Sequence, residues 1–345
     1  MRLLIARVSF KSRQRMSPEA DRSSNYLKGG WGSMTQTELF IQLIINGVTL
    51  GSYLALIALG YTMVYGIIEL INFAHGDVYM LGFMISLTFL EFLGINRTLG
   101  GLQLWVIIFG IMFVTMLCTG TINTLVDRIG YKPLRRAPRL AALITAVGMS
   151  FMLENLGMLW KGPSQINYPN IFPTIDILND LLEMKTAVLF TTKDVFLMGV
   201  TVPLIVILIL FIGKTKMGKA MRATAQDREA AALMGINVET VIRNTFFIGG
   251  ALAGAAGMMV GLYLNTGRYL MGFDAGLLAF TSAVLGGIGN IGGAVLGGYV
   301  IGFLNSVSDQ YLSSEWTRAL VFTILILVLV FKPSGLLGER TPEKD

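Results

Sequence analysis

The sequence has little charge for its length. Of its 345 residues only 14% are Asp, Glu, Lys or Arg, whereas 54% are hydrophobic, and its mean hydropathy is +0.66. A soluble domain carries about a quarter charged residues. This deficit excludes an ordinary water-soluble fold. Several apolar runs approach the roughly 20 residues that cross a bilayer as a helix, so we predict an integral membrane protein.

Cysteine and histidine are almost absent, since Cys118 and His75 are the only ones. One cysteine cannot form an intrachain disulfide, and a zinc site needs several such ligands, so no metal or cofactor is expected. Cys118 lies in an apolar run and is expected to be a small hydrophobic residue of the interior.

The sequence also lacks a P-loop, the motif that binds the phosphates of ATP. If ATP drives its function, another polypeptide must hydrolyse it.

The positive charge of the chain is concentrated at its start. Residues 1–33 carry seven basic and two acidic residues, a balance of +5, and the remainder carries 20 against 19, a balance of +1. The net charge of +6 therefore does not indicate a nucleic-acid partner. We expect residues 1–37 to be a disordered N-terminal extension or the result of a start site upstream of Met34. A basic arm that touches anionic lipid is the alternative.

Five segments are clean candidates for membrane spans. Two further regions, 39–94 and 265–312, are apolar but contain glycines and isolated polar residues, the pattern of discontinuous helices. The fold class predicted is an all-α integral membrane protein with eight to ten transmembrane helices, some broken or re-entrant. The clean spans are 103–126, 140–160, 195–213, 246–264 and 319–331.

The distribution of Lys and Arg predicts the orientation, because these residues collect in cytoplasmic loops. The basic loops 128–139 and 214–243 are expected inside, and the loop 161–193 outside. The region 39–94 must then cross the membrane one or three times. This places both termini in the cytoplasm, with 38–338 as the transmembrane domain and 339–345 as a cytoplasmic tail.

A group of polar residues interrupts the first apolar region: Glu69, Asn72, His75 and Asp77. Ionisable groups are expensive at the centre of a bilayer, so they are expected inside the bundle or near an interface. One interpretation is a part of the translocation pathway. The other is a helix break at which these side chains cap backbone groups. Catalysis by His75 alone is not expected, because no nucleophile or partner motif accompanies it.

A glycine-rich stretch near the end of the chain contains Gly286, Gly287, Gly289 and Asn290. Small residues at intervals of four favour close packing of membrane helices. The alternative is a re-entrant turn whose backbone lines the pathway, which membrane proteins tolerate where it faces protein or water. A nucleotide-binding loop is not expected, because neither a preceding strand nor a following Lys-Ser or Lys-Thr is present.

The segment 214–240 is predicted to form two short helices on the cytoplasmic side. Asp227 is placed to cap a short helix over residues 228–234, and Gly235 to end it. Glu229, Ala230 and Ala231, followed by Gly235, fit the pattern by which permeases engage an ATPase. We therefore predict an ATPase-coupling surface in this segment.

Several runs in the sequence are similar to one transporter family. They are Asn46 to Ile68, Ile71 to Asp77, Arg222 to Asp227, Leu233 to Asn237, Phe280 to Gly289 and Lys332 to Gly338. Together they resemble, in order over residues 38–338, the permeases of bacterial high-affinity branched-chain amino acid ABC importers. The extension 1–33 is the one departure from this pattern.

This resemblance implies an importer permease fold in the inner membrane, and a pore subunit that moves amino acids by alternating access. It implies four partners: a paralogous permease, two cytoplasmic ATPases and a periplasmic binding protein. Related permeases carry urea or short amides, which stays open as an alternative. A second alternative is an ion-coupled transporter with Glu69, His75 and Asp77 as a proton relay. A membrane enzyme is a remote third.

Overall fold

The computed structural model describes residues 34–338 except 136, 185 and 313. The expectations for the extension before Met34 and for the tail 339–345 lie outside the described residues. Within them the chain is almost wholly helical, apart from a short antiparallel pair, β1 (Ile166–Asn167) with β2 (Thr266–Gly267). The all-α fold predicted from the sequence is confirmed.

Nine of the described helices make up the bundle, which is within the predicted eight to ten. Seven are long and apolar enough to cross a membrane. They are α2 (Gln36–Ile68), α4 (Gly101–Val126), α5 (Arg139–Lys161), α6 (Thr192–Lys214), α9 (Val238–Leu264), α11 (Ile291–Tyr311) and α12 (Ser314–Phe331). The other two are α3 (Ala74–Phe92), which carries the polar group, and the shorter α10 (Met271–Gly286).

The outer helices present apolar faces that no described part of the chain covers. Phe113 on α4 is 62% exposed, Ile207 on α6 is 62% exposed and Val330 on α12 is 70% exposed. Such surfaces would be unstable in water but match the hydrocarbon of a bilayer. They are therefore the lipid-facing sides of the bundle.

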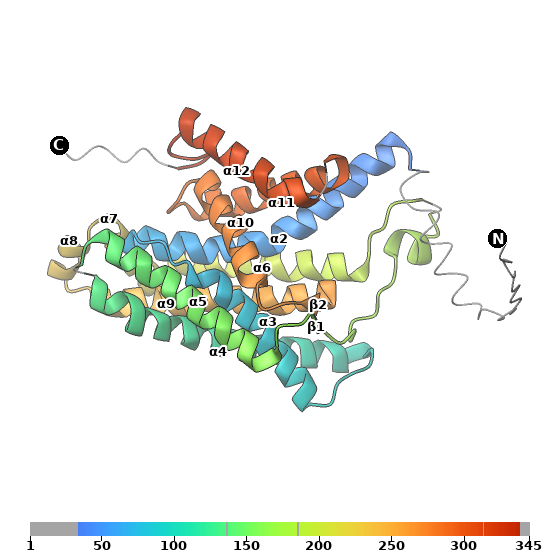
Figure 1. Ribbon diagram of the computed structural model, residues 1–345, viewed down its shortest axis with the longest axis horizontal. Coiled ribbons are helices and arrows are strands. Elements are labelled where there is room, and N and C mark those ends of the chain that lie inside the picture. Colours follow the sequence, from blue (N-terminus) through green and yellow to red (C-terminus); the bar gives the residue numbers. More distant parts are fainter. Residues whose placement is uncertain (1–33, 136, 185, 313, 339–345) are drawn as a thin grey trace, which may run out of the picture.

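Two short helices outside the bundle define its ends (Figure 1). α7 (Lys216–Gln226) and α8 (Arg228–Leu233) lie together at one end, here called the α7–α8 end. The opposite end carries the β strands and the segment between α5 and α6, and is called the β1–β2 end. At the α7–α8 end, α4 continues into a π-helical turn (Asp127–Tyr131) and a 3-10 turn (Lys132–Leu134). A second π-helical turn (Ile177–Leu181) precedes α6.

The first apolar region forms two helices, not the one or three passes inferred from charge. Glu38 at the start of α2 accepts an N–H from the segment before α6, at the β1–β2 end. The carbonyl of Ile67 near the end of α2 accepts Nε of Arg228 on α8, 2.8 Å away. Glu91 in the last turn of α3 then pairs with the final residue of α5, so the chain has returned to the β1–β2 end.

The number of crossings inferred from charge parity for residues 39–94 is therefore wrong for the described chain. The last residues after α12 contact the α10–α11 turn at the α7–α8 end, whereas α2 begins at the β1–β2 end. The two ends of the described chain thus lie at opposite ends of the bundle. The parity argument failed because it placed the start of the apolar region on the side of residues 1–33, which lie outside the described residues.

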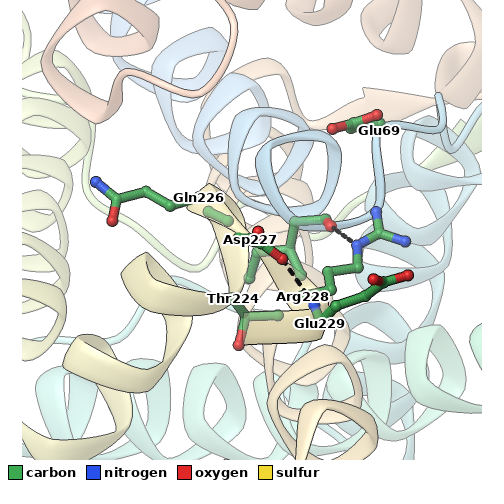
Figure 2. Close-up of a pocket in the computed structure, with 8 residues that line it drawn as sticks. Glu69, Thr224, Gln226, Asp227, Arg228 and Glu229 are labelled. Atoms are coloured by element: carbon green, nitrogen blue, oxygen red, sulfur yellow. Dashed lines mark hydrogen bonds between the residues drawn. The ribbon is translucent and has the colours of Figure 1, made fainter. Parts of the chain in front are cut away.

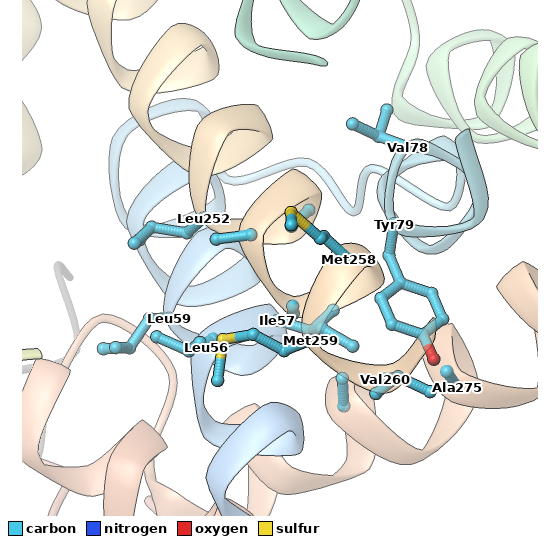
Figure 3. Close-up of a cluster of buried hydrophobic side chains, with 14 of the residues drawn as sticks. Leu56, Ile57, Leu59, Val78, Tyr79, Leu252, Met258, Met259, Val260 and Ala275 are labelled. Carbon is cyan, nitrogen blue, oxygen red and sulfur yellow. The ribbon is translucent and has the colours of Figure 1, made fainter. Parts of the chain in front are cut away.

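The interior of the bundle is built around α2 and α9. In the apolar stretch of α9 78% of the residues are buried, against 17% in α12. Figure 3 shows Leu56 of α2 beside Met259 of α9, and Tyr79 of α3 pointing toward Val260 and Ala275. Close packing of these side chains fixes where α3 and α10 can lie.

Glycines allow α2 and α11 to touch along their backbones. A Cβ placed on Gly298 would lie 2.6 Å from Cα of Ala55, and one placed on Gly51 would lie 2.7 Å from Cα of Tyr299. Both distances are too short for any side chain. Small residues permit this approach in membranes, where lipid gives no hydrophobic drive for helix association. The packing interpretation of the glycine-rich sequence is thus confirmed for α11.

Candidate functional site

The short helix α8 forms as the sequence predicts. Oδ1 of Asp227 accepts the backbone N–H groups of Glu229 and Ala230, at 2.9 and 3.0 Å. These bonds satisfy donors that a helix start otherwise leaves open. Gly235 follows the helix with a φ of 82°, a conformation that glycine adopts without strain. A capped start and a glycine stop therefore fix the length of this helix.

The tip of α8 presents apolar side chains away from the bundle. Leu233 is 88% exposed and Met234 is 83% exposed. Glu229 and Ala230 are exposed as well, whereas Ala231 is buried against the rest of the segment. Of the three predicted coupling residues on α8, Ala231 anchors the helix, whereas Glu229 and Ala230 lie on its outer surface. Exposed apolar groups among charged side chains at the end of the bundle indicate a binding surface.

A polar pocket separates α8 from the end of α2 (Figure 2). Its cavity is about 400 Å³, and a second cavity of about 230 Å³ lies on the other side of Glu69 and Arg228. Glu69 ends α2 in a left-handed conformation, with φ of 54°. Burial lowers the pKa of the Arg228 guanidinium, and the Glu69 carboxylate opposes that change. The first cavity is lined by Ile67, Glu69, Thr224, Ala225, Gln226, Asp227, Arg228 and Glu229.

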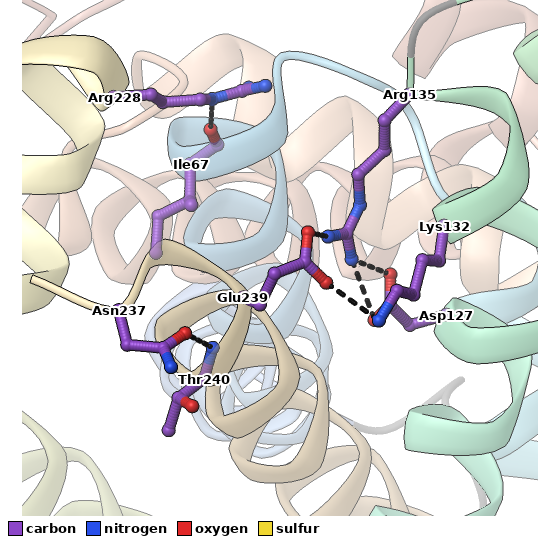
Figure 4. A network of polar contacts seen from close by, with 8 residues as sticks. All are labelled: Ile67, Asp127, Lys132, Arg135, Arg228, Asn237, Glu239 and Thr240. Carbon is purple, nitrogen blue, oxygen red and sulfur yellow. Dashed lines mark hydrogen bonds and ion pairs between the residues drawn. The ribbon is translucent and has the colours of Figure 1, made fainter. Parts of the chain in front are cut away.

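A network of ion pairs joins α4 to α9 at the same end (Figure 4). Arg135 binds both carboxylate oxygens of Asp127, at 2.6 and 2.9 Å, and also contacts Glu239 in the first turn of α9 at 2.5 Å. Lys132 lies 3.1 Å from Glu239. The basic loop predicted from the sequence therefore has specific acidic partners, which the sequence alone did not identify.

Asn72, one of the predicted pathway residues, ties three helices together. It is 1% exposed, donates to Asn123 on α4 at 3.3 Å, and accepts the hydroxyl of Tyr131 at 2.9 Å. Asn123 in turn donates to the carbonyl of Phe246 on α9. This chain of bonds positions the start of α3, which supports the structural interpretation of Asn72.

His75 and Asp77 lie on the first turn of α3, inside the bundle. Both are 0% exposed. The ring of His75 contacts that of Tyr61 edge to face, with centroids 4.8 Å apart, and Gly60 leaves the space that the imidazole fills. Asp77 accepts the hydroxyl of Ser150 on α5 at 2.5 Å. The structure brings these two residues together in one buried layer, while Glu69 lies at the surface.

The predicted glycine residues form a tight turn between α10 and α11. Gly287 and Gly289 have φ of 108° and 91°, values that other residues rarely adopt. Asn290 caps α11 by accepting the N–H of Gly293 at 2.9 Å and donates to the carbonyl of Leu337 at 2.8 Å. The turn lies at the α7–α8 end and joins α10 to α11.

The residues 332–338 fold back over this turn and are called the C-terminal clip. The N–H groups of Leu336 and Leu337 donate to the carbonyls of Leu285 and Gly286, at 2.8 and 2.9 Å. Together with the bond from Asn290, they hold the clip across the end of α10. Gly286, Gly287 and Asn290 are thus positioned by the last described residues of the chain.

Sequence reasoning missed the polar residues of α5. Ser150 and Glu154 are 7% and 8% exposed and lie one helical turn apart, within an otherwise apolar helix. Their spacing of four residues places them on one face. That spacing was the available signal, since a polar pair on one face of a membrane helix indicates a contact inside the bundle.

Comparisons with known proteins identify the class of the chain. A family model described as the permease component of branched-chain amino acid transport systems matches residues 43–329. The LivH permease protein of the high-affinity branched-chain amino acid transport system of Salmonella typhimurium is 40% identical over 308 residues, which are 88% of this chain and 97% of that protein. The BraD permease protein of Pseudomonas aeruginosa is 37% identical, over 88% of this chain and 98% of its own. No solved structure is a significant match.

Proposed function

This chain belongs to the permease family of branched-chain amino acid transport systems, and from that premise we propose that it forms the pore of an ATP-driven importer. It moves branched-chain or other hydrophobic amino acids across the inner membrane by alternating access. The similarity covers nearly the whole length of relatives that are named as branched-chain amino acid permeases. That breadth favours this substrate class over urea or short amides within the same family.

The observation that carries this proposal is the exposed apolar tip of α8. Leu233 and Met234 lie outside the bundle, on a six-residue helix too short to be stable alone. The Asp227 cap and the packing of Ala231 hold the helix in place. A partner that covers this tip would be coupled directly to the end of α2 through Arg228. We assign that partner as a cytoplasmic ATPase.

The other subunits follow from this arrangement. Two ATPases bind at the α7–α8 end, which we place in the cytoplasm, with the segment 214–240 as the coupling region within the domain 38–338. A paralogous permease completes the pore, and a periplasmic binding protein delivers substrate to the β1–β2 end. The lipid bilayer covers the exposed apolar faces of α4, α6 and α12. Glu69, Asn72, His75, Asp77 and the α10–α11 turn belong to the moving pathway.

The test is uptake by the complete transporter in proteoliposomes. The variants Leu233→Asp and Met234→Asp should abolish ATP-dependent leucine uptake and prevent copurification of the ATPases, because a charge replaces the apolar contact. Leu181 at the β1–β2 end is 71% exposed and provides the matched control. Leu181→Asp should leave ATPase binding unchanged.

Two results would overturn the proposal. One is leucine uptake at the normal rate by the Leu233→Asp variant with its ATPases still bound. The other is uptake by the wild-type complex that follows a proton gradient without ATP, which would favour an ion-coupled transporter.

A further inference from the structure

Two carboxylates in the bundle form no ion pair with a cation among the described residues. Asp77 on α3 is 0% exposed, and Glu154 on α5 is 8% exposed and is the single acidic residue of that helix. None of the ion pairs found among the described residues involves either of them. Buried carboxylates are costly in a membrane bundle unless they are paired. Their presence between apolar helices therefore calls for a ligand.

The geometry brings the two carboxylates to one place. Ser150 donates its hydroxyl to Oδ2 of Asp77 at 2.5 Å, and Glu154 lies one turn further along the same face of α5. Asp274 on α10 is already paired with Arg268 and Arg318, at 2.6 and 3.0 Å. Neither Asp77 nor Glu154 has such a pair among the described residues.

One oxygen of Asp77 also lacks a hydrogen bond. Oδ1 is fully buried and has no partner among the described residues. It faces Gly272 of α10, where a Cβ would lie 2.7 Å away. A glycine at this position keeps a side chain off the carboxylate, so that the backbone of α10 lies directly against it. If α10 separates from α3, both carboxylates become open to a donor.

An apolar crevice begins beside this pair. The hydroxyl of Tyr61 reaches Gly276 of α10, directly opposite the turn that carries Asp77, and its ring lies 6.1 Å from that of Phe280. A small cavity of about 10 Å³ lies there. It is lined by Tyr61, Tyr65, Ile71, Phe280, Ala283 and Ile288. Tyr61 thus lies between the turn that carries Asp77 and this aromatic-aliphatic lining.

We propose that Asp77 and Glu154 bind the α-ammonium group of the transported amino acid, while the crevice beside Tyr61 and Phe280 receives its hydrophobic side chain. The inference rests on the proposed function, and it names the part of the chain that recognises the substrate. An ammonium group supplies the positive charge and the N–H donors that the two carboxylates lack. An inorganic cation would neutralise the carboxylates equally, but it has no hydrophobic group to occupy the crevice.

The first experiment measures leucine uptake by the complete transporter with isosteric variants. Asp77→Asn and Glu154→Gln should each lower the rate of uptake at least tenfold, with the ATPases still copurifying. The matched control is Glu91→Gln, which removes a half-exposed carboxylate at the β1–β2 end and should keep the wild-type rate. If the wild-type complex itself shows no ATP-dependent uptake, the proposed function fails. If it transports and the two variants keep its rate, the present inference fails.

The second experiment tests binding without transport. Dicyclohexylcarbodiimide modifies carboxyl groups inside membrane proteins, and the labelling of Glu154 in the complex can be followed by mass spectrometry. Leucine should slow this labelling several-fold, whereas 2-hydroxy-4-methylpentanoate, which has the same carboxylate and side chain but no ammonium group, should not. Equal protection by both compounds, or none by leucine, would overturn the proposal. Protection by sodium chloride alone would assign the carboxylates to an inorganic cation and overturn it as well.

Discussion

Ser150 on α5 donates its hydroxyl to Oδ2 of Asp77 on α3, at a distance of 2.5 Å. The two residues come from helices that are separated in the sequence by the whole of α4. The other face of α5 is exposed to lipid, as Phe151 at 58% exposure shows. This hydrogen bond therefore fixes the rotation of a peripheral helix against the centre of the bundle.

Ser150→Ala should destabilise the folded chain by about 1–3 kcal/mol, because it leaves Asp77 buried with both oxygens unpartnered. The measurement is the thermal unfolding midpoint of the purified protein in detergent. Thr121→Ala is the matched control, since Thr121 is exposed and its hydroxyl donates only to a carbonyl of its own helix. Equal midpoints for both variants would contradict a role for the Ser150 bond in stability.

Arg135→Ala should cost about 3–5 kcal/mol, because removing one partner of a buried ion pair leaves the other uncompensated. Arg135 and Asp127 are 13% and 5% exposed in this pair. Lys132→Ala breaks a pair that is 54% and 53% exposed, so its cost should stay below about 1 kcal/mol. Chemical unfolding of both variants in the same detergent checks the difference, and a cost for Lys132→Ala as large as that for Arg135→Ala would refute it.

Gly298→Ala should destabilise the protein by about 1–3 kcal/mol, because the new methyl group meets the backbone of α2. Gly148→Ala is the comparison, because nothing lies within 4 Å of a Cβ at that position on α5. That change should stabilise its helix by up to about 1 kcal/mol. Unfolding midpoints that move in opposite directions are the expected outcome, and a neutral Gly298→Ala would show that α2 and α11 can separate freely.

Asp227→Ala should weaken α8 by about 1 kcal/mol through loss of the cap, and leucine uptake should fall with it. Asp227→Asn keeps an oxygen that accepts the same N–H groups and should retain most of the activity. Uptake and ATPase copurification, measured side by side, separate the cap from the charge. A loss as large with Asn as with Ala would assign the role of Asp227 to its charge.

The long apolar helices were predictable because a continuous apolar run of about 20 residues has one structural interpretation, a membrane-spanning helix. The span expected at 195–213 is the centre of α6, and the short helix after Asp227 was expected within one residue of its observed end. In both cases local information decides the structure, through a continuous apolar run or through a cap and a glycine stop.

The first apolar region was not predictable in the same way. Gly47, Gly51 and Gly60 resemble helix breaks in the sequence, yet all three lie inside α2. Each of them faces a close neighbour on α11 or α3, so the glycine serves packing and not a turn. The partners of Asp77 were hidden for a similar reason. Ser150 lies 73 positions away, and only the packing of α5 on α3 brings it within reach.

The glycine contact between α2 and α11 can form only after α11 has been synthesised, long after α2. The bond from Ser306 to the carbonyl of Leu43 in this interface joins residues 263 positions apart. At about 5–20 residues per second, synthesis separates the two by roughly 13–50 s. During that time α2 stands in the membrane with its glycine face uncovered. A chaperone or the insertion machinery that shields this face would determine the yield of folded protein, whatever the stability of the finished bundle.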